Sequence, residues 1–363
     1  MPRRIGFLLL RDFALMSCAA AVEPLRAANL LQDRALYDLT FLSVNGGRAA
    51  ASVGAGFDTV ALRDVTAPFD MVFVVAGGNP MGARHVEAWR FLRAQGRRGV
   101  ALGGISGGAA VLAQAGLMAG RRFTVHWQHY DALREESADY LMERRLFVID
   151  RDRFTCAGGA APLDMMHALI TTHHGAGLAT RVADWFIHTR IRDADDPQRT
   201  GTAERYRIHD PVLVATVDLM ESHIADPLSL DQLAALAGTS PRHLQRQFRM
   251  RMGTSLMRFY RDLRLDKARD LLAQTALPVL EVALATGFAN GAHFARAFRD
   301  RFGQRPSALR AGSDGDAGDQ EGPKWREGPE RSANAVAGGG AALAAGRTGQ
   351  KPGIGLEGRM KLT

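Results

Sequence analysis

The segment GGISGGAAVL (residues 103–112) marks an abrupt change from a strand-like to a helix-like sequence. The apolar run VALGGIS (100–106) leads into it, and a helical pattern over 107–117 follows. Its Gly-x-Ser-x-Gly spacing, with Ser106 at the centre, is typical of a sharp strand-to-helix turn that presents one side chain and several backbone N–H groups. The segment therefore predicts one strand–turn–helix unit of an α/β domain.

Similar units lie on both sides of this segment. Apolar runs of strand length are found at 5–10, 41–44, 71–77 and 154–158, and helical patterns lie between them at 13–32, 82–95 and 161–173. Strands that are apolar on both faces and alternate with helices favour a parallel sheet covered on both sides. Residues 1–190 are therefore predicted to form an α/β, flavodoxin-like parallel sheet sandwich.

The composition changes twice after this domain. A polar stretch at 191–207 is expected to be a linker, and residues 208–310 read as an all-α domain. Residues 311–363 contain 13 glycines among 53 residues, which predicts a disordered low-complexity tail. The chain of 363 residues has only two cysteines and no apolar run long enough to span a bilayer, so we expect no membrane contact and a cytoplasmic location.

The all-α region contains an internal repeat of about 50 residues, LDQLAALAGTSPRHLQRQFRMRMG (230–253) and VLEVALATGFANGAHFARAFRDRFG (279–303). Each copy predicts a short helix, a turn with a glycine, and a second helix, which is the helix-turn-helix plan. Leu233, Leu236, Leu244 and Phe248 are expected to form the core of the first copy. Ser240 and Asn290 precede the second helices and predict their N-terminal caps.

The second helix of each copy has a polar outer face. Such a helix inserts into the DNA major groove, where arginine reads guanine, glutamine reads adenine, and other arginines meet phosphates. Between residues 241 and 264 there are seven arginines and one acid, which also favours a nucleic-acid partner. The predicted DNA-binding residues are Ser240, Arg242, His243, Gln245, Arg246, Arg249, Asn290, His293, Arg296 and Arg299.

The region between the two copies predicts a long amphipathic helix, SLMRFYRDLRLDKARDLLAQT (255–275). Its expected buried side is formed by Met257, Tyr260, Leu263, Leu265, Ala268, Leu271 and Leu272. The three pieces SLDQLAALAGTSPRHLQRQF, RLDKARDLL and EVALATGFANGAHFARAFRDRFGQRPS together strongly resemble the AraC/XylS family. That resemblance implies two helix-turn-helix units held at a fixed spacing by a linker helix, binding double-stranded operator DNA at a promoter.

The first domain resembles the PfpI-like branch of the class I glutamine amidotransferase-like fold. The resemblance is carried by AAAVEPLRAANLL (19–31), VVAGGNP (74–80), GGISGGAAVLAQAGLMAGRRFTVHW (103–127) and FTCAGGAAPLDMMHALI (154–170). Joined to an AraC-type domain, the chain looks like a GlxA-type transcription regulator. Catalytic members of the fold carry a cysteine, a glutamate and a histidine where this chain has Ser106, Glu23 and His126.

The serine favours ligand binding over catalysis, because a hydroxyl needs an oriented base and His126 has no evident partner acid. Backbone amides at the turn suit a carboxylate, Glu23 suits a cation, and Trp127 offers a cation–π face. This chemistry and the resemblance favour an amino-acid-like or quaternary-amine effector such as arginine, glycine betaine or carnitine. The predicted pocket consists of Glu23, Gly77, Gly78, Ser106, Gly107, His126 and Trp127.

We therefore predict a ligand-responsive activator that is not an enzyme and has no catalytic residue, cofactor or metal. A homodimer and a contact with RNA polymerase are also expected. Two alternatives stay open at this point: a PfpI-fold hydrolase or amidase with an appended DNA-binding module, and an architectural DNA-binding protein whose first domain only dimerises. The histidine pairs His173–His174 and His126–His129 lack an acidic or cysteine partner at a spacing that suits a metal ion.

Overall fold

The computed structural model describes residues 1–315 of the chain. The low-complexity tail was expected from residue 311, but the last helix, α14 (Pro306–Gly315), continues through its first five positions. The remainder of that prediction, residues 316–363, lies outside the described residues. No helix in residues 1–315 is long and apolar enough to cross a membrane.

The N-terminal domain is built on an eight-stranded sheet with the order β3-β4-β2-β1-β5-β6-β10-β9. The strands are β1 (Arg3–Leu9), β2 (Tyr37–Ser43), β3 (Gly47–Ala50), β4 (Gly56–Ala61), β5 (Met71–Ala76), β6 (Ala101–Ser106), β9 (Phe147–Asp150) and β10 (Arg153–Cys156). A separate pair is formed by β7 (Arg122–Phe123) and β8 (Leu141–Met142). The five strands expected from sequence all form, and the pairs among β2, β1, β5, β6 and β10 are parallel.

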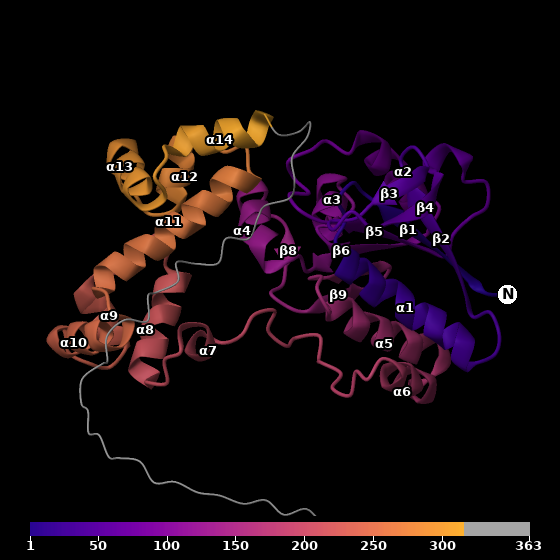
Figure 1. The fold of residues 1–363 in the computed structure, drawn as a ribbon, viewed down its shortest axis with the longest axis horizontal. Coiled ribbons are helices and arrows are strands. Elements are labelled where there is room, and N and C mark those ends of the chain that lie inside the picture. Colours follow the sequence, from indigo (N-terminus) through magenta and orange to yellow (C-terminus); the bar gives the residue numbers. More distant parts are fainter. Residues whose placement is uncertain (316–363) are drawn as a thin grey trace, which may run out of the picture. The chain divides into compact units, whose positions relative to one another are not determined.

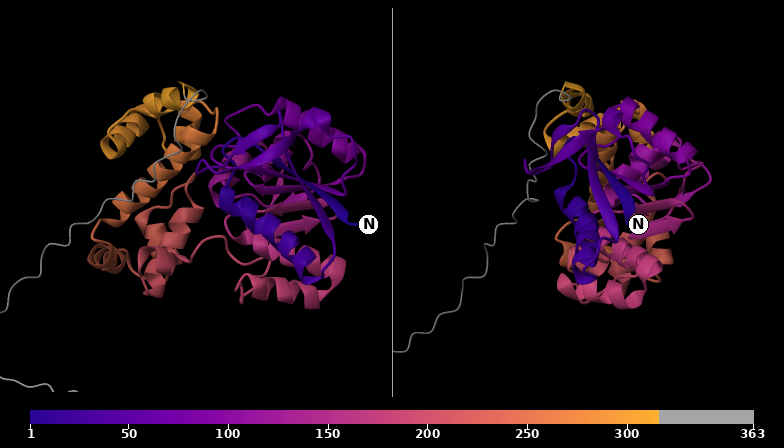
Figure 2. Two further views of the ribbon diagram at one scale, coloured as in Figure 1. Left: turned by 45° about the vertical axis from the view of Figure 1, so that its right-hand side comes forward. Right: turned by 90° about the vertical axis from the view of Figure 1, so that its right-hand side faces the viewer.

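Two layers of helices cover this sheet, as the sequence predicts (Figure 1). The helices are α1 (Leu15–Leu31), α2 (Val86–Arg97), α3 (Gly108–Gln114), α4 (Trp127–Glu136), α5 (Ala161–His174) and α6 (Ala176–Trp185). One apolar core lies between the sheet and helices α1, α5 and α6, and a second lies between the opposite face and helices α2, α3 and α4. Figure 2 shows α1 beside the strands from two further directions.

Both edges of the sheet depart from the purely parallel arrangement that we expected. β3 pairs with β4 and β9 pairs with β10 in the antiparallel sense. These short hairpins were not recognised in the sequence. β3 has only exposed and half-buried residues and gives no apolar run, and β9 is only four residues long. The parallel centre of the sheet, which carries Ser106, is unaffected.

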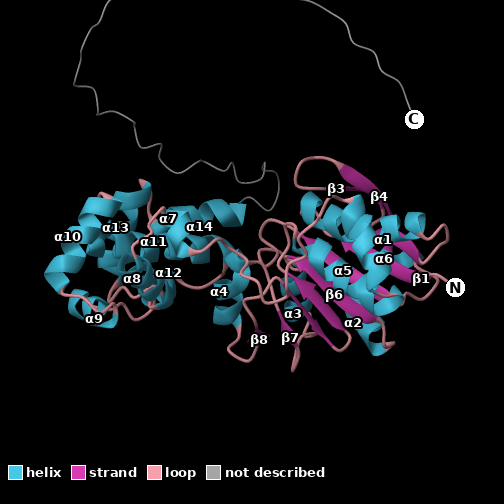
Figure 3. Ribbon diagram, turned by 90° about the horizontal axis from the view of Figure 1, so that it is seen from below, coloured by secondary structure: helices cyan, strands magenta, loops and turns pink. Residues whose placement is uncertain are grey.

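The C-terminal domain is entirely helical within the described residues (Figure 3). Its helices are α7 (Thr202–Tyr206), α8 (Pro211–Ser222), α9 (Leu230–Leu236), α10 (Pro241–Met252), α11 (Leu256–Gln274), α12 (Val279–Ala285), α13 (Gly291–Phe302) and α14. Helices α9 and α10 form the first helix-turn-helix unit, and α12 and α13 form the second. Each unit has its own apolar core, and α11 contributes to both cores.

Two residues expected in these cores are exposed. Leu236, at the end of α9, has 60% of its surface accessible, and Met257, in the first turn of α11, has 43%. Both predictions were wrong because a helix buries only one stripe, and Leu233 and Tyr260 already occupy it. The other residues predicted on the inner side of α11 are buried, except that Leu263 is only half-buried.

The segment expected to be a linker makes specific contacts with the N-terminal domain. The amide nitrogen of Gln198 donates to the Thr124 hydroxyl at 3.0 Å and to the carbonyls of Val125 and Arg145 at 3.1 and 2.7 Å. The backbone N–H of Leu146 donates to the carbonyl of Ala194. The first part of this segment is therefore held against the α/β domain.

A buried carboxylate ties the same segment to α5. Asp164, in the first turn of α5, accepts two hydrogen bonds from the Arg192 guanidinium at 3.0 and 2.7 Å and one from the Arg192 backbone N–H. His188 Nε2 lies 3.0 Å from the same carboxylate, whose side chain is fully buried. Asp164 therefore holds the chain after α6 in place through groups that sequence reasoning did not connect.

We expect Asp164→Ala to lower the free energy of unfolding by about 3–5 kcal/mol, because it leaves the Arg192 guanidinium without its counter-charge in a largely buried site. Urea titration of the full chain measures this change. Asp195→Ala, which removes an exposed carboxylate from the same segment, is the matched control and should change stability by less than about 0.5 kcal/mol. Equal effects of the two substitutions would contradict the structural role of Asp164.

Candidate effector pocket and nucleic-acid interface

Ser106 ends β6 in a backbone conformation that few side chains adopt. Its φ is +56°, in the left-handed region, and helix α3 begins two residues later at Gly108. A side chain on Gly108 would overlap the carbonyl of Val74 on the neighbouring strand β5, so only glycine allows α3 to start here. The sequence-predicted sharp turn is thus present, and strain of this kind is found mainly where a side chain has a functional position.

The loops that carry most of the predicted pocket residues meet at the carboxyl ends of the central strands. Ala76 is in register with Ser106, and Cys156 with Ile105, so β5, β6 and β10 end together. Gly158 lies so close to the strand-to-helix turn at Ser106, here called the elbow, that a Cβ on Gly158 would be 2.7 Å from the Ser106 Cβ. Around these strand ends, Gly107 packs against Pro80 and Gly77 against the Asp12–Ala14 backbone, with Gly78 following at φ +57°.

The two ionisable residues of the predicted pocket already have local partners. Glu23 accepts a hydrogen bond from Arg26, one turn further along α1, with a closest N–O distance of 2.7 Å. His126 caps α4 by accepting a hydrogen bond from the Gln128 backbone N–H. Burial, with a smaller contribution from His129, lowers the pKa of His126 to about 4, so this imidazole is neutral at pH 7.

Trp127 holds a cation in this structure. The guanidinium carbon of Arg199 lies 4.3 Å from the centroid of its ring, within the range of a cation–π interaction. Arg199 follows Gln198, which is anchored to the α/β domain, and burial lowers the pKa of its guanidinium. Sequence reasoning proposed the ring as a cation site but did not identify Arg199, which lies about 70 residues away in the chain.

The chemistry at the elbow favours binding over nucleophilic attack. Cys156, on the neighbouring strand β10, is fully buried. Burial raises the pKa of its thiol to about 12, although backbone hydrogen bonds from Gly158 and Ser106 act to lower it. A protonated thiol is a poor nucleophile. Ser106 itself has no hydrogen bond to a histidine among the residues that the structure describes, which is the contact that would activate its hydroxyl.

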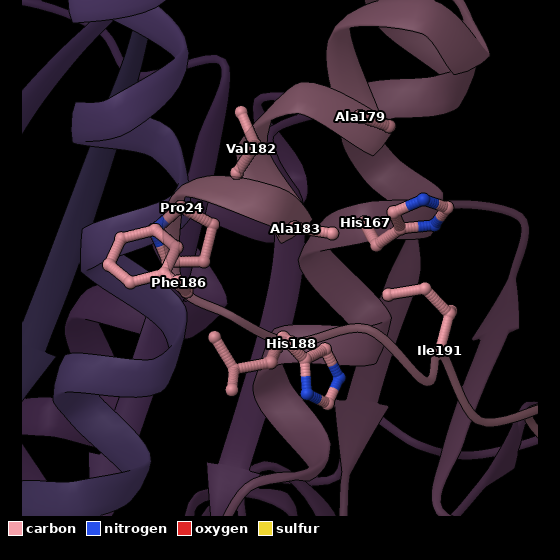
Figure 4. A pocket seen from close by; sticks show the side chains of 9 residues that line it. Pro24, His167, Ala179, Val182, Ala183, Phe186, His188 and Ile191 are labelled. Carbon is pink, nitrogen blue, oxygen red and sulfur yellow. The ribbon is translucent and has the colours of Figure 1, made fainter. Parts of the chain in front are cut away.

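A small apolar hollow opens elsewhere on the same domain, between α1, α5 and α6 (Figure 4). Pro24, Phe186 and Ile191 line it together with His167 and His188. None of the predicted pocket residues lines this hollow, and His188 is already bound to Asp164. Within residues 1–315 no group of three or more histidine, cysteine or acidic side chains is arranged to hold a metal ion.

Both recognition helices begin with the predicted caps. The Ser240 hydroxyl accepts a hydrogen bond from the His243 backbone N–H, and the side-chain oxygen of Asn290 accepts one from the His293 backbone N–H. Each turn has its glycine in the left-handed region, at Gly238 with φ +68° and at Gly287 with φ +75°. The polar residues that the sequence assigns to DNA binding are all exposed: Ser240, Arg242, His243, Gln245, Arg246, Arg249, Asn290, His293, Arg296 and Arg299.

The two recognition helices differ in how many of their arginines lack a carboxylate partner within the described residues. Helix α10 has four arginines and no acid, whereas α13 has three arginines and Asp300. Arg301 of α13 is also committed to α11, since it donates to Asp266 at 2.5 and 3.1 Å and pairs with Asp262 at 3.0 Å. Its repeat equivalent, Arg251, is exposed and has no carboxylate partner among the described residues. The first unit therefore offers more unpaired positive charge to a polyanion.

An α/β domain followed by two helix-turn-helix units with exposed arginines defines a DNA-binding transcription regulator. Residues 3–172 match the DJ-1/PfpI family, and residues 233–312 match a family described as a helix-turn-helix domain. Both matches fall on the domains that the structure shows. The fold class predicted from the sequence, α/β followed by all-α, is confirmed.

Three similar proteins extend this result to most of the chain. The HTH-type transcriptional regulator GlxA of Rhizobium meliloti is 46% identical over 309 residues, covering 85% of this chain and 95% of that protein. CdhR of Pseudomonas aeruginosa is 42% identical, covering 86% and 92%, and GbdR of the same species is 41% identical, covering 86% and 85%. The chain belongs to this GlxA-type family of HTH-type transcriptional regulators. The transcription regulator predicted from the sequence is thus confirmed.

The close contact of Gly158 with Ser106 gives a direct test of the packing around the elbow. Gly158→Ala should lower the free energy of unfolding and disturb the pocket, because its Cβ would lie 2.7 Å from the Ser106 Cβ at a φ of +97°. Gly159→Ala is the matched control, since its φ is +58° but nothing lies within 4 Å of its Cβ, and it should cost only about 1–2 kcal/mol. Urea titration compares the two, and a smaller effect at Gly158 would contradict this packing.

Proposed function

We propose that this regulator is a transcription activator controlled by a small effector with a carboxylate and a cationic head, such as arginine, glycine betaine or carnitine. The proposed site consists of Glu23, Gly77, Gly78, Ser106, Gly107, His126 and Trp127, and its four loop residues follow or end β5 and β6, whose last residues are in register. The observation that carries the proposal is Arg199 on the Trp127 ring, because it places a guanidinium, the group that free arginine carries, against a residue of the predicted pocket. Glu23 provides the negative charge, and its present partner Arg26 is a second internal cation.

A route from this pocket to DNA runs through α4. This helix starts at Trp127 and contacts α11, within the same compact unit of the chain. Nδ1 of His129 lies 3.2 Å from the side-chain oxygen of Gln274, and Asn79, next to Gly78, donates to the Ala273 carbonyl at 3.0 Å. Movement of α4 when an effector binds would therefore act directly on the helix that carries both DNA-binding units.

A thermal-shift screen with arginine, glycine betaine, dimethylglycine and carnitine tests the effector. A ligand at 100 times its dissociation constant should stabilise the protein by about 2.7 kcal/mol. Ser106→Ala should reduce this stabilisation, while Ser307→Ala, on α14, should leave it unchanged. If none of these compounds stabilises the protein, the proposed effector class is rejected and a purely architectural role is favoured. If the protein hydrolyses a substrate and this activity depends on Ser106, the proposal of a pocket that only binds its ligand is rejected.

We infer that the two recognition helices enter successive major grooves on one face of operator DNA, about one helical turn or 34–36 Å apart. The support is the repeat itself: α10 and α13 have equivalent caps, buried phenylalanines and exposed arginines. The same proposal includes a homodimer, a contact with RNA polymerase at the promoter, and a location in the bacterial cytoplasm at the nucleoid. Exposed apolar residues on and after the α1 and α6 helices, Met16, Leu30, Trp185 and Ile187, support a protein–protein interface.

Arg246→Ala and Arg296→Ala should each relax base preference at one position, with the two positions about ten base pairs apart. Loss of an arginine that reads guanine costs about 1–3 kcal/mol at that base, whereas loss of a phosphate contact weakens all sequences equally and lowers the salt slope by about one. Binding of each variant to a library of operator variants at fixed salt distinguishes these results. The two-groove geometry is wrong if both substitutions affect the same base pairs or neither affects specific binding.

A further inference from the structure

Helix α11 joins two apolar cores that have no buried residue in common. Its N-terminal half places Leu256 and Tyr260 in the core of the first unit, and its C-terminal half places Leu265 and Ala268 in the core of the second. If only a single helix joined the two cores, the two helix-turn-helix units could change their relative orientation by bending of that helix. Tyr260 and Arg264, four residues apart on one face of α11, lie at this junction.

Arg264 reaches the turn of the second unit. Its Nε donates to the carbonyl of Thr286 at 2.8 Å, and its Nη2 donates to the carbonyl of Gly287 at 2.5 Å. The guanidinium also lies 4.3 Å from the centroid of the Phe288 ring. Charge-assisted hydrogen bonds to two successive carbonyls fix both the position and the direction of the turn that precedes α13.

Tyr260 makes the corresponding contacts with the first unit. Its hydroxyl donates to the carbonyl of His223 at 2.5 Å and accepts a hydrogen bond from the Leu228 backbone N–H at 3.3 Å. The side chain is almost fully buried, and burial raises its pKa. Tyr260 thus holds both ends of the loop between α8 and α9, on the same side of α11 as the Arg264 contacts.

The two held segments touch each other. A Cβ on Gly287 would lie 2.6 Å from Cγ of Pro227 and 2.7 Å from the carbonyl oxygen of Ile224, both in the loop that Tyr260 holds. Gly238, the equivalent glycine of the first unit, has nothing within 4 Å of its Cβ. The glycine of the second turn is therefore needed for contact between the units as well as for its backbone conformation.

We propose that Tyr260, Arg264 and the contact of Gly287 with Pro227 form a clamp that fixes the two recognition helices relative to each other, so that the protein accepts only one spacing between its two DNA segments. Tyr260 and Arg264 are positioning residues, because neither is on a recognition helix. The consequence for DNA rests on the proposed two-groove binding, whereas the clamp itself does not.

Distance measurements between spin labels test the clamp without DNA. The labels are placed by Met250→Cys and Asp300→Cys, equivalent exposed positions on α10 and α13, and the native cysteines are buried. The parent chain should give one narrow distance distribution. Arg264→Met, Tyr260→Phe and Gly287→Ala should each broaden it, whereas the controls Arg261→Met and Gly238→Ala should not. Circular dichroism establishes that each variant is folded, and Tyr260→Phe, which keeps the ring, is the mildest change.

Operator duplexes with one base pair inserted between the two segments test the consequence. The insertion moves the second segment by about 3.4 Å and turns it by about 35°. The parent should lose affinity strongly on this DNA. Arg264→Met should bind the original spacing about tenfold more weakly, equivalent to one charge-assisted hydrogen bond, but should lose less on insertion.

The outcomes separate the two proposals. Narrow distributions in all three clamp variants, or a broad one in the parent, would overturn the clamp. A parent with a narrow distribution but no sensitivity to the insertion would support the clamp and reject two-groove binding. Broadening in the variants together with relaxed spacing supports both.

Discussion

The absence of side chains around the Ser106 turn is the packing constraint on which the α/β domain depends. A Cβ on Gly104 would lie 2.5 Å from the backbone nitrogen of Ala109, and one on Gly108 would overlap the Val74 carbonyl. Helix α3 can therefore start directly against the sheet only because these positions are glycine. Ser106 has its left-handed conformation at this turn, and the last residues of β5 and β6 are in register there. Of the predicted pocket residues, Gly77, Gly78, Ser106 and Gly107 lie at these strand ends.

The C-terminal domain depends on a different constraint, the continuity of α11 through two cores. The first unit buries Leu244 and Phe248 of α10, the second buries Phe294, Ala297 and Phe298 of α13, and both leave the arginines outside. The units are similar in fold but unequal in charge, since Arg301 is bound to the carboxylates of α11 while most arginines of α10 are unpaired. An exposed arginine without a counter-ion remains available to phosphate or a base edge, whereas one already in an ion pair must first break it.

The side chains around Ser106 explain why the elbow suits ligand binding better than catalysis. Catalysis needs a nucleophile whose proton can be removed, yet Cys156 is kept protonated by burial and Ser106 has no histidine within hydrogen-bonding distance among the described residues. Binding needs only shape and complementary charge. The partners of Trp127 and Glu23 in this structure, Arg199 and Arg26, are both cations.

Local sequence by itself determined the elements with strong patterns: the central parallel strands, the two helix-turn-helix units, their caps at Ser240 and Asn290, and the exposed faces of the recognition helices. These follow from periodicity and from hydrogen bonds between near neighbours, which a sequence shows directly. Only the tertiary structure decided which distant groups meet. The pairings of Arg199 with Trp127, Asp164 with Arg192, and Arg264 with the turn at Gly287 join residues that are far apart in the chain. Such contacts depend on how the elements pack, because burial and charge neutralisation are properties of the assembled fold.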